Sequence, residues 1–266
     1  TSQTCAKPFL SRTIHRLLAG SDPNKDQSYF LCQLSQRQLS RALFPIGHLL
    51  KPEVRRIATE QHLATAARKD SQGICFVGKV DLPVFLQQQL AAKDGDIVEI
   101  PSGWPGYRSL PADAPLGRLA EPFRYEPSDG ARVGCHRGAH FFTIGQRKGL
   151  NVGGKPEPLF VIGTDVERNI LYVGQGQRHP GLYRRALYML PDEIHWVRPD
   201  LALKTGENRR YLVRIRYRQP LQGAVLYRTA EGGFVVFDEP QRGVTAGQFA
   251  AWYDGEELIG SGVIHR

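Results

Sequence analysis

The chain has 266 residues, of which 41% are hydrophobic and 23% are charged, and it carries a formal net charge of +9. This length and apolar content suffice for two domains with their own cores, and no run of about 18 apolar residues exists, so we expect a cytoplasmic protein without a membrane partner. The excess of positive charge favours a polyanionic partner such as nucleic acid.

The N-terminal half predicts short helices and few strands. Ser35 is a typical N-cap, and Pro52 suits the first turn of a helix. The region over 101–130 is rich in proline, glycine and charge, so we expect a surface insertion there. In chain order, the predicted elements are a strand over 16–20, helices over 35–44, 52–61 and 82–92, and a strand over 96–100.

The C-terminal half predicts mostly β-structure. Short apolar or alternating runs are separated by turns at regular spacing, among them 231–233 and 254–255. This spacing fits a small antiparallel barrel or sandwich. The predicted strands cover residues 159–163, 170–173, 211–218, 224–228, 234–237, 249–253 and 258–264.

Cys75 is the candidate catalytic residue. The segment over 69–78 surrounds it with two glycines and places a lysine, an aspartate and a serine just upstream, which is a context for a reactive thiolate. The alternative from the residues alone is a small hydrophobic side chain buried at a strand end. The four cysteines form no C-x-x-C pair, which disfavours a zinc ribbon, a thioredoxin-like motif and a disulfide framework.

Arginines alternate along the predicted strand over 210–218. Since successive side chains of a strand point to opposite faces, one face carries the arginines Arg210, Arg214, Arg216 and Arg218. Four like charges on one face repel each other, and phosphates would relieve the repulsion through bidentate contacts. The alternative is a solvated outer face with acidic partners on neighbouring strands.

Two other segments carry weaker signals. Cys135, His136 and His140 lie within one short stretch, but a closed metal site would need another ligand, so we expect no metal. The basic, glycine-rich loop over 145–154 could cradle a phosphate through its backbone N–H groups, or it could need glycine only for its turns.

Five segments, in this order, carry a resemblance to a known family. They are residues 25–31 (KDQSYFL), 43–47 (LFPIG), 70–78 (DSQGICFVG), 143–150 (TIGQRKGL) and 215–219 (IRYRQ). The series closely resembles the tRNA-specific 2-thiouridylases, which are ATP-dependent sulfurtransferases that replace the C2 oxygen of the wobble uridine with sulfur. The likeness runs from about Leu17 to Arg266.

The resemblance implies an α+β part followed by an all-β part. The end of an adenylating α/β domain would cover 1–78, a small central domain with the insertion 79–180, and a C-terminal antiparallel β-barrel 181–266. The family's Ser-Gly-Gly-x-Asp-Ser nucleotide loop and its first catalytic cysteine are expected before Thr1, and Cys5 lacks the family's Asp-x-x-Cys context. We therefore expect the C-terminal two-thirds of such an enzyme, lacking the ATP-binding N-terminal part.

The resemblance also implies the roles of individual residues. Cys75 matches the cysteine that carries the persulfide and forms a disulfide with the first cysteine. ATP would be bound by the missing part, so no cofactor is expected in this chain. The partners would be tRNA and a sulfur-relay protein or cysteine desulfurase. The positions that match tRNA contacts are Lys25, Asp26, Gln27, Arg216, Tyr217 and Gln248.

Two functions follow from these expectations. The first is 2-thiolation of the wobble uridine with sulfur carried on Cys75, by an enzyme of which this chain alone would be inactive. The second is a non-catalytic, tRNA-binding fragment of such an enzyme. A general thiol oxidoreductase is less favoured because no second cysteine lies at redox spacing.

Overall fold

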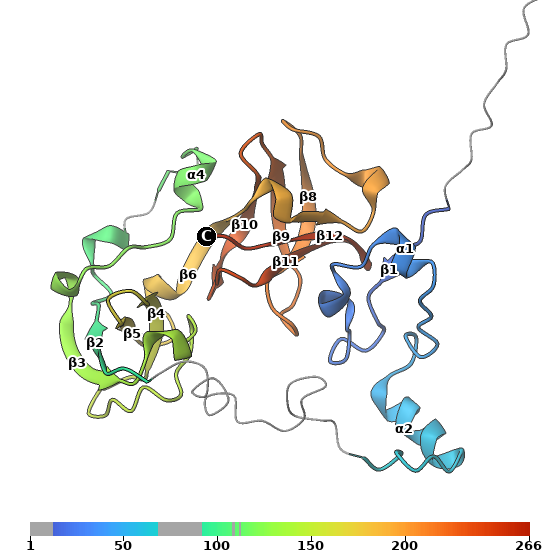
Figure 1. The fold of residues 1–266 in the computed structure, drawn as a ribbon, viewed down its shortest axis with the longest axis horizontal. Helices are drawn as coiled ribbons and strands as arrows, with labels where there is room; N and C mark the ends of the chain where they lie inside the picture. Colours follow the sequence, from blue (N-terminus) through green and yellow to red (C-terminus); the bar gives the residue numbers. More distant parts are fainter. Residues whose placement is uncertain (1–12, 69–91, 108–109, 112) are drawn as a thin grey trace, which may run out of the picture.

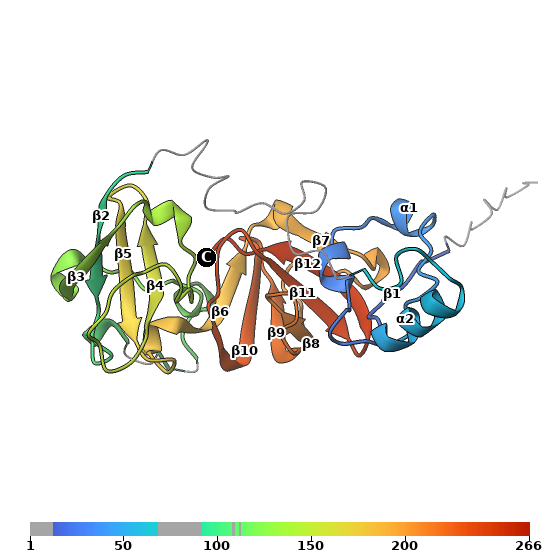
Figure 2. The same ribbon diagram turned by 90° about the horizontal axis from the view of Figure 1, so that it is seen from below.

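The computed structural model describes residues 13–68, 92–107, 110–111 and 113–266. Figures 1 and 2 show three parts in a row: a small four-stranded unit, a larger sheet in the middle, and the helical N-terminal segment at the other end. Cys75 and all but the last residue of the predicted helix over 82–92 lie outside the described residues. Within the ranges that are described, no helix has the length and apolar character needed to cross a membrane.

The larger sheet of the described residues has eight strands, and every pair in it is antiparallel. The strands are β1 (Leu17–Leu18), β6 (Tyr183–Met189), β7 (Ile194–Trp196), β8 (Asn208–Arg214), β9 (Gln222–Arg228), β10 (Gly233–Arg242), β11 (Phe249–Asp254) and β12 (Glu257–Val263). Their order is β1-β12-β11-β8-β9-β10-β6, and β7 also pairs with β12. The N–H of His265 donates to the carbonyl of Tyr188 at 2.8 Å, and the N–H of Tyr188 donates to Arg266 at 2.7 Å, so the sheet closes into a barrel.

The alternation of side chains along the strands decides what fills the barrel. In β8, Tyr211 and Val213 are buried, whereas Leu212 between them is 39% exposed. The inward side chains pack with Phe237 and Trp252 in one apolar core. Full burial of one large apolar side chain contributes about 1.5–3 kcal/mol, so this inner layer is the main source of the barrel's stability. The predicted antiparallel β-structure of the C-terminal half is confirmed.

The smaller sheet has four strands in the described residues, in the order β3-β2-β5-β4. They are β2 (Gly95–Glu99), β3 (Ala131–His136), β4 (Leu159–Asp165) and β5 (Ile170–Gln175). The predicted strands over 96–100, 159–163 and 170–173 are confirmed, whereas β3 was not predicted. The side chain of Asn169, in the turn between β4 and β5, accepts a hydrogen bond from the N–H of Ala139 at 2.9 Å, and this contact ties the turn to the 3₁₀ helix η4 (Ala139–Phe141).

The region over 101–130 runs mostly over the surface, but some of its side chains reach a core. It forms three short helical elements: η2 (Pro105–Tyr107), α4 (Leu116–Leu119) and η3 (Pro127–Asp129). Tyr125 is only 5% exposed, and the hydroxyl of Tyr107 donates to its hydroxyl at 3.0 Å. The rings of Trp104 and Phe123 complete this cluster. Most of the described residues here are exposed or half-buried, in keeping with the predicted surface excursion. The aromatic cluster was not predicted, because aromatic side chains without helical or strand spacing give no pattern that reveals their packing.

Short helical elements follow β1 in the N-terminal segment. A turn of 3₁₀ helix, η1 (Ser28–Leu31), precedes α1 (Gln36–Leu39), whose N-cap is Ser35. The N–H of Ser35 donates to the side-chain oxygen of Gln38 at 2.9 Å as half of a capping box, which confirms the predicted N-cap. This helix ends well before the predicted residue 44. The second predicted helix is confirmed as α2 (Lys51–Glu60).

The N-terminal segment shares a core with the barrel. β1 pairs with β12, so that Leu17 lies opposite Leu258. Buried side chains from both parts form one cluster: Leu17, Tyr29, Cys32 and Leu39 from the segment, and Val197, Ala251, Tyr253 and Leu258 from the barrel. Residues far apart in the sequence thus exclude water from the same apolar layer.

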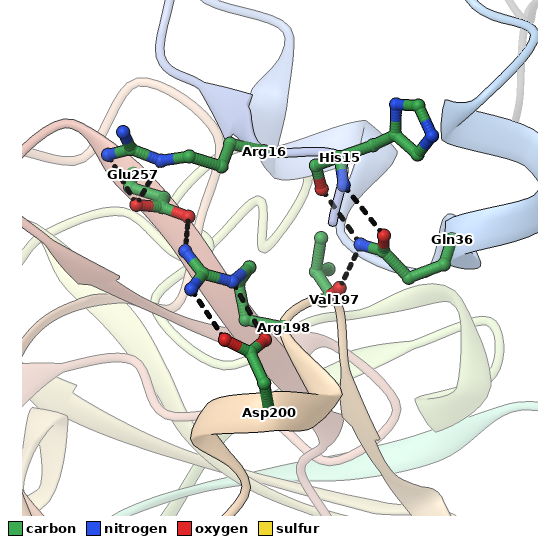
Figure 3. A network of polar contacts seen from close by, with 7 residues as sticks. All are labelled: His15, Arg16, Gln36, Val197, Arg198, Asp200 and Glu257. Carbon is green, nitrogen blue, oxygen red and sulfur yellow. Dashed lines mark hydrogen bonds and ion pairs between the residues drawn. The ribbon is translucent and has the colours of Figure 1, made fainter. Parts of the chain in front are cut away.

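A polar network surrounds the edge of this shared core (Figure 3). Glu257 in β12 is 6% exposed and accepts hydrogen bonds from Arg16, with the nitrogen Nε at 2.7 Å, and from Arg198. The amide of Gln36 donates to the carbonyls of His15 at 2.8 Å and Val197 at 2.7 Å. Burial alone would raise the pKa of Glu257, but the hydrogen bonds from the two arginines outweigh burial and hold this pKa below its ordinary value.

Candidate nucleic-acid interface

Three segments that carry the predicted tRNA-contacting residues meet where the barrel touches the N-terminal segment. The hydroxyl of Tyr29 in η1 donates to the carbonyl of Ile215, just after β8, at 3.1 Å, and to that of Phe249, at the start of β11, at 3.0 Å. Lys25, Asp26 and Gln27 precede this tyrosine, Arg216 and Tyr217 follow Ile215, and Gln248 precedes Phe249. The fold therefore gathers all six predicted contact positions around one tyrosine.

Asp26 lies inside this junction and holds its shape. Its side chain is 4% exposed, and its oxygens accept hydrogen bonds from the N–H of Gly20 at 3.1 Å and from the N–H and hydroxyl of Ser28 at 3.0 and 2.9 Å. The guanidinium of Arg214 pairs with the same carboxylate at 3.1 Å. The predicted tRNA contact at Asp26 disagrees with this geometry, because protein donors already occupy its oxygens.

Gln27 and Tyr217 lie on the outer side of the junction. The amide of Gln27 donates to the hydroxyl of Tyr217 at 3.2 Å. The ring of Tyr217 lies 4.6 Å from the ring of Phe30, which is 61% exposed, and the guanidinium of Arg218 lies 5.2 Å from the Tyr217 ring. Exposed aromatic rings next to positive charge form a surface on which RNA bases stack. Phe30 was not predicted as a contact, although it falls within the motif over 25–31.

The predicted face of four arginines is wrong. β8 ends at Arg214, and Arg218 adopts a φ of 66°, so the alternation of a strand does not continue through this segment. Arg210 forms an ion pair with Asp238 on the outside of the barrel, whereas Arg214 is buried against Asp26. Side chains after the last strand residue no longer follow the two faces of the sheet, and Tyr217 is half-buried against the core that the N-terminal segment shares with the barrel.

Arg216 connects the barrel to the glycine-rich loop. Its nitrogen Nη2 donates to the carbonyl of Gly243 at 2.7 Å and to that of Ile144 at 3.1 Å. Gly243 has a φ of 70°, and a Cβ atom there would lie 2.5 Å from this nitrogen, so only glycine fits. Burial, and next the nearby positive charge of Arg242, lower the pKa of Arg216.

The glycine-rich loop borders an open hollow of about 340 Å³. Arg147, Gly153, Gly154 and Lys155 contribute to its lining. Lys155 is paired with Glu99 at 2.5 Å, which removes part of the positive charge that a phosphate would meet. The predicted phosphate cradle thus stays a prediction, and the contact from Ile144 to Arg216 is the clearer link between this loop and the interface.

Gln248 and the histidine stretch complete the predicted positions. Gln248 is half-buried, and its side-chain oxygen has no hydrogen-bond donor among the described residues. The ring nitrogen Nδ1 of the buried His136 accepts from the N–H of Gly138 at 2.9 Å, and burial lowers the pKa of this histidine. No group of three or more potential metal ligands occurs in the part of the chain that the structure describes.

Comparison with known proteins identifies the family of the chain. A family model described as tRNA methyl transferase HUP domain matches residues 6–79, one described as tRNA methyl transferase PRC-barrel domain matches 124–175, and one described as aminomethyltransferase beta-barrel domain matches 188–264. The chain is 57% identical, over 272 residues, to the tRNA-specific 2-thiouridylase MnmA of Flavobacterium johnsoniae, with 99% of the chain and 69% of the relative covered. The chain belongs to the tRNA-specific 2-thiouridylase family.

Other members of the family show the same likeness. Identity to the tRNA-specific 2-thiouridylase MnmA of Christiangramia forsetii is 58% over 256 residues, covering 94% of the chain and 65% of the relative. Identity to that of Pseudomonas aeruginosa PAO1 is 46% over 252 residues, covering 93% of the chain and 58% of the relative. The chain thus spans between 58% and 69% of the length of these three family members.

The match to the HUP domain corrects one expectation. The chain does not lack the family's ATP-binding domain as predicted, because residues 6–79 match the model of that domain. The expectations that no cofactor-binding part belongs to this chain, and that the chain alone is inactive for that reason, lose their basis.

Proposed function

We propose that this chain acts in the ATP-dependent 2-thiolation of the wobble uridine of tRNA. The gathering of the predicted contact positions at one junction supports this proposal, since nothing in their sequence spacing requires them to meet. Lys25, Gln27, Arg216, Tyr217 and Gln248 are the proposed contacts with tRNA. Family membership supports the same activity, because the relatives are named for it.

Aromatic stacking and positive charge have separate roles at this interface. The ring of Tyr217, held by Gln27 and flanked by Phe30, offers a face to an unpaired base. Arg216 brings charge to the neighbouring backbone phosphate. Asp26 keeps the turn that presents Lys25 and Gln27, which makes it a positioning residue instead of a contact.

Sulfur transfer is assigned to Cys75. The C2 oxygen of uridine is a poor leaving group, and ATP, when bound, would supply the activation that turns it into a better one. A persulfide on Cys75 would present a more nucleophilic sulfur than the thiol, with the sulfur delivered by a relay protein or a cysteine desulfurase. Transfer of this sulfur to uridine breaks the S–S bond and needs two electrons. A second cysteine supplies them and ends as a disulfide with Cys75, or an external thiol reductant supplies them and Cys75 returns to a thiol.

One helix N-terminus in the described part of the matched domain is already occupied. Helix α2 is the longest helix in the described part of the HUP match, and the first N–H of this helix, from Lys51, already donates to the carboxylate of Asp22 at 3.0 Å. Its N-terminus is therefore not open to a phosphate. ATP stays in the proposal through family membership, and the roles proposed for the tRNA contacts do not depend on where it binds.

The decisive experiment compares single cysteine variants in a thiolation assay with the complete gene product. The Cys75→Ser variant should lose thiouridine formation while it keeps tRNA binding, because only the proposed sulfur carrier is changed. Cys135→Ser is the matched control, since Cys135 is exposed and its loss opens no cavity. Wild-type amounts of thiouridine from the Cys75→Ser protein would overturn the assignment.

A further inference from the structure

Arg242, at the end of β10, carries a charge that no protein group neutralises among the described residues. Its guanidinium lies 4.8 Å from the ring of the buried Phe160 in β4, which fixes its orientation. Two of its three nitrogens, Nε and Nη2, are buried, and neither has an acceptor within the described ranges. A half-buried cation without a partner costs free energy, so its retention calls for an explanation outside folding.

Arg216 reaches the residue next to Arg242, because its Nη2 donates to the carbonyl of Gly243 at 2.7 Å, and it shares this lack of neutralisation. The carbonyls of Gly243 and Ile144 occupy its Nη2, but its Nε is buried without an acceptor in the described part of the chain. Within the same ranges, no ion pair joins either arginine to a carboxylate, in contrast to Arg210 and Arg214. Two neighbouring cations of this kind repel each other and produce a local positive field.

The glycine-rich loop passes beside Arg216. Gly145 has a φ of 86°, and a Cβ atom there would make ordinary van der Waals contact, at 3.9 Å, with Nη1 of Arg216. Arg147 and Lys148, both exposed, extend from the same loop. A group with several negative oxygens could therefore approach the two guanidinium groups along this loop.

We propose that Arg216 and Arg242 together bind one phosphate of the tRNA backbone, with the loop over 143–149 beside it. Arg242 is the new residue of this site, and the inference rests on the proposed function. A phosphodiester suits this pair because each of its two free oxygens can face one guanidinium group. The exposed ring of Phe30 lies 4.6 Å from the half-buried ring of Tyr217, which follows Arg216 in the chain, so a strand that stacks there has a phosphate within reach of the site.

The site makes a distinctive prediction, because the same charge would cost stability and support binding. Arg242→Gln should keep or raise the melting temperature, since it removes a half-buried cation without a partner. It should also weaken tRNA binding about tenfold and lower the slope of log affinity against log salt by about 0.7 to 0.9. A residue with only a structural role would change these two quantities in the same direction.

Matched variants separate a local contact from a general charge effect. Arg210→Gln removes the same formal charge from the barrel, but Asp238 already neutralises Arg210, so its salt slope should equal that of the wild type. Arg242→Lys should keep most of the slope and lose part of the affinity, because lysine keeps the charge without the planar fork. In the double variant of Arg242→Gln and Arg216→Gln, the fold-loss of tRNA affinity should be smaller than the product of the fold-losses of the two single variants, because both residues bind one phosphate.

Four outcomes would overturn the proposal. The first two concern the salt slope of tRNA binding: a wild-type slope in Arg242→Gln, or an equal change of slope in Arg210→Gln. The other two are fully multiplicative losses of tRNA affinity in the double variant, and a loss of inorganic phosphate or ATP binding in Arg242→Gln with tRNA binding intact. Each of these leaves the proposed function standing, because the wild-type protein still binds tRNA in that experiment. Failure of the wild-type protein to bind tRNA at low salt would instead contradict the proposed function.

Discussion

Asp26 and Gln27 are neighbours in the chain, yet the fold uses them for opposite purposes. The carboxylate of Asp26 is surrounded by donors from Gly20, Ser28 and Arg214, whereas the amide of Gln27 lies on the outer surface beside Tyr217. At the scale of single residues, charge alone therefore does not identify a contact with RNA. One motif can contain a residue whose side chain stabilises a turn and others whose side chains the turn exposes for binding.

Asp26→Asn should destabilise the protein by about 3 kcal/mol, because it removes one partner of a buried ion pair and leaves Arg214 uncompensated. The free energy of unfolding, measured with urea, tests this. Asp238→Asn is the control, since its pair with Arg210 is exposed and should contribute less than about 1 kcal/mol. Equal effects of the two substitutions would show that Asp26 does not have the positioning role that its burial indicates.

At the scale of elements, a single carboxylate fastens the N-terminal segment to the barrel. Glu257 belongs to β12, Arg16 immediately precedes β1, and Arg198 follows β7, so three elements converge on one buried group. Ion pairs at the surface contribute little, but Glu257 is almost fully shielded from water. The attachment of β1 thus depends on the ionisation of a residue in β12.

Stability should consequently fall in acid. The pKa of Glu257 is lowered in the folded protein from its ordinary value of 4.5, so its contribution is complete above that value and is lost as the pH drops through the folded-state pKa. Melting temperatures of the wild type and of Glu257→Gln should differ at pH 7 and converge below about pH 4. A difference that stays constant down to pH 3 would contradict this account.

Sequence patterns predicted elements well where one local rule dominates. Ser35 specified its helix start through capping, and the alternation in β8 specified which side chains fill the barrel. The same alternation failed beyond Arg214, because a bend driven by tertiary contacts replaced the strand. The role of Arg242 left no signal in the sequence, since it depends on Phe160, which lies 82 positions away and stacks on it only in the folded chain.

At the scale of the whole molecule, the N-terminal segment and the barrel should open as one cooperative unit. The N–H of Ala19 donates to the carbonyl of Glu256 at 2.8 Å, and the surrounding side chains belong to the shared core. Hydrogen exchange of Ala19 should therefore be about as slow as that of Tyr188 in the barrel. Exchange of Ala19 that is faster by several orders of magnitude would show that the segment opens independently.

The shared core also limits how this protein can be divided. The family models place Leu17 and Leu258 in different domains, but the two side chains belong to one apolar cluster. A barrel produced without the N-terminal segment would present Ala251, Tyr253 and Leu258 to water, and an apolar face of this kind favours aggregation. The barrel is thus not an independent domain. A barrel that is inherited, grafted or isolated has to keep some thirty residues from the opposite end of the chain.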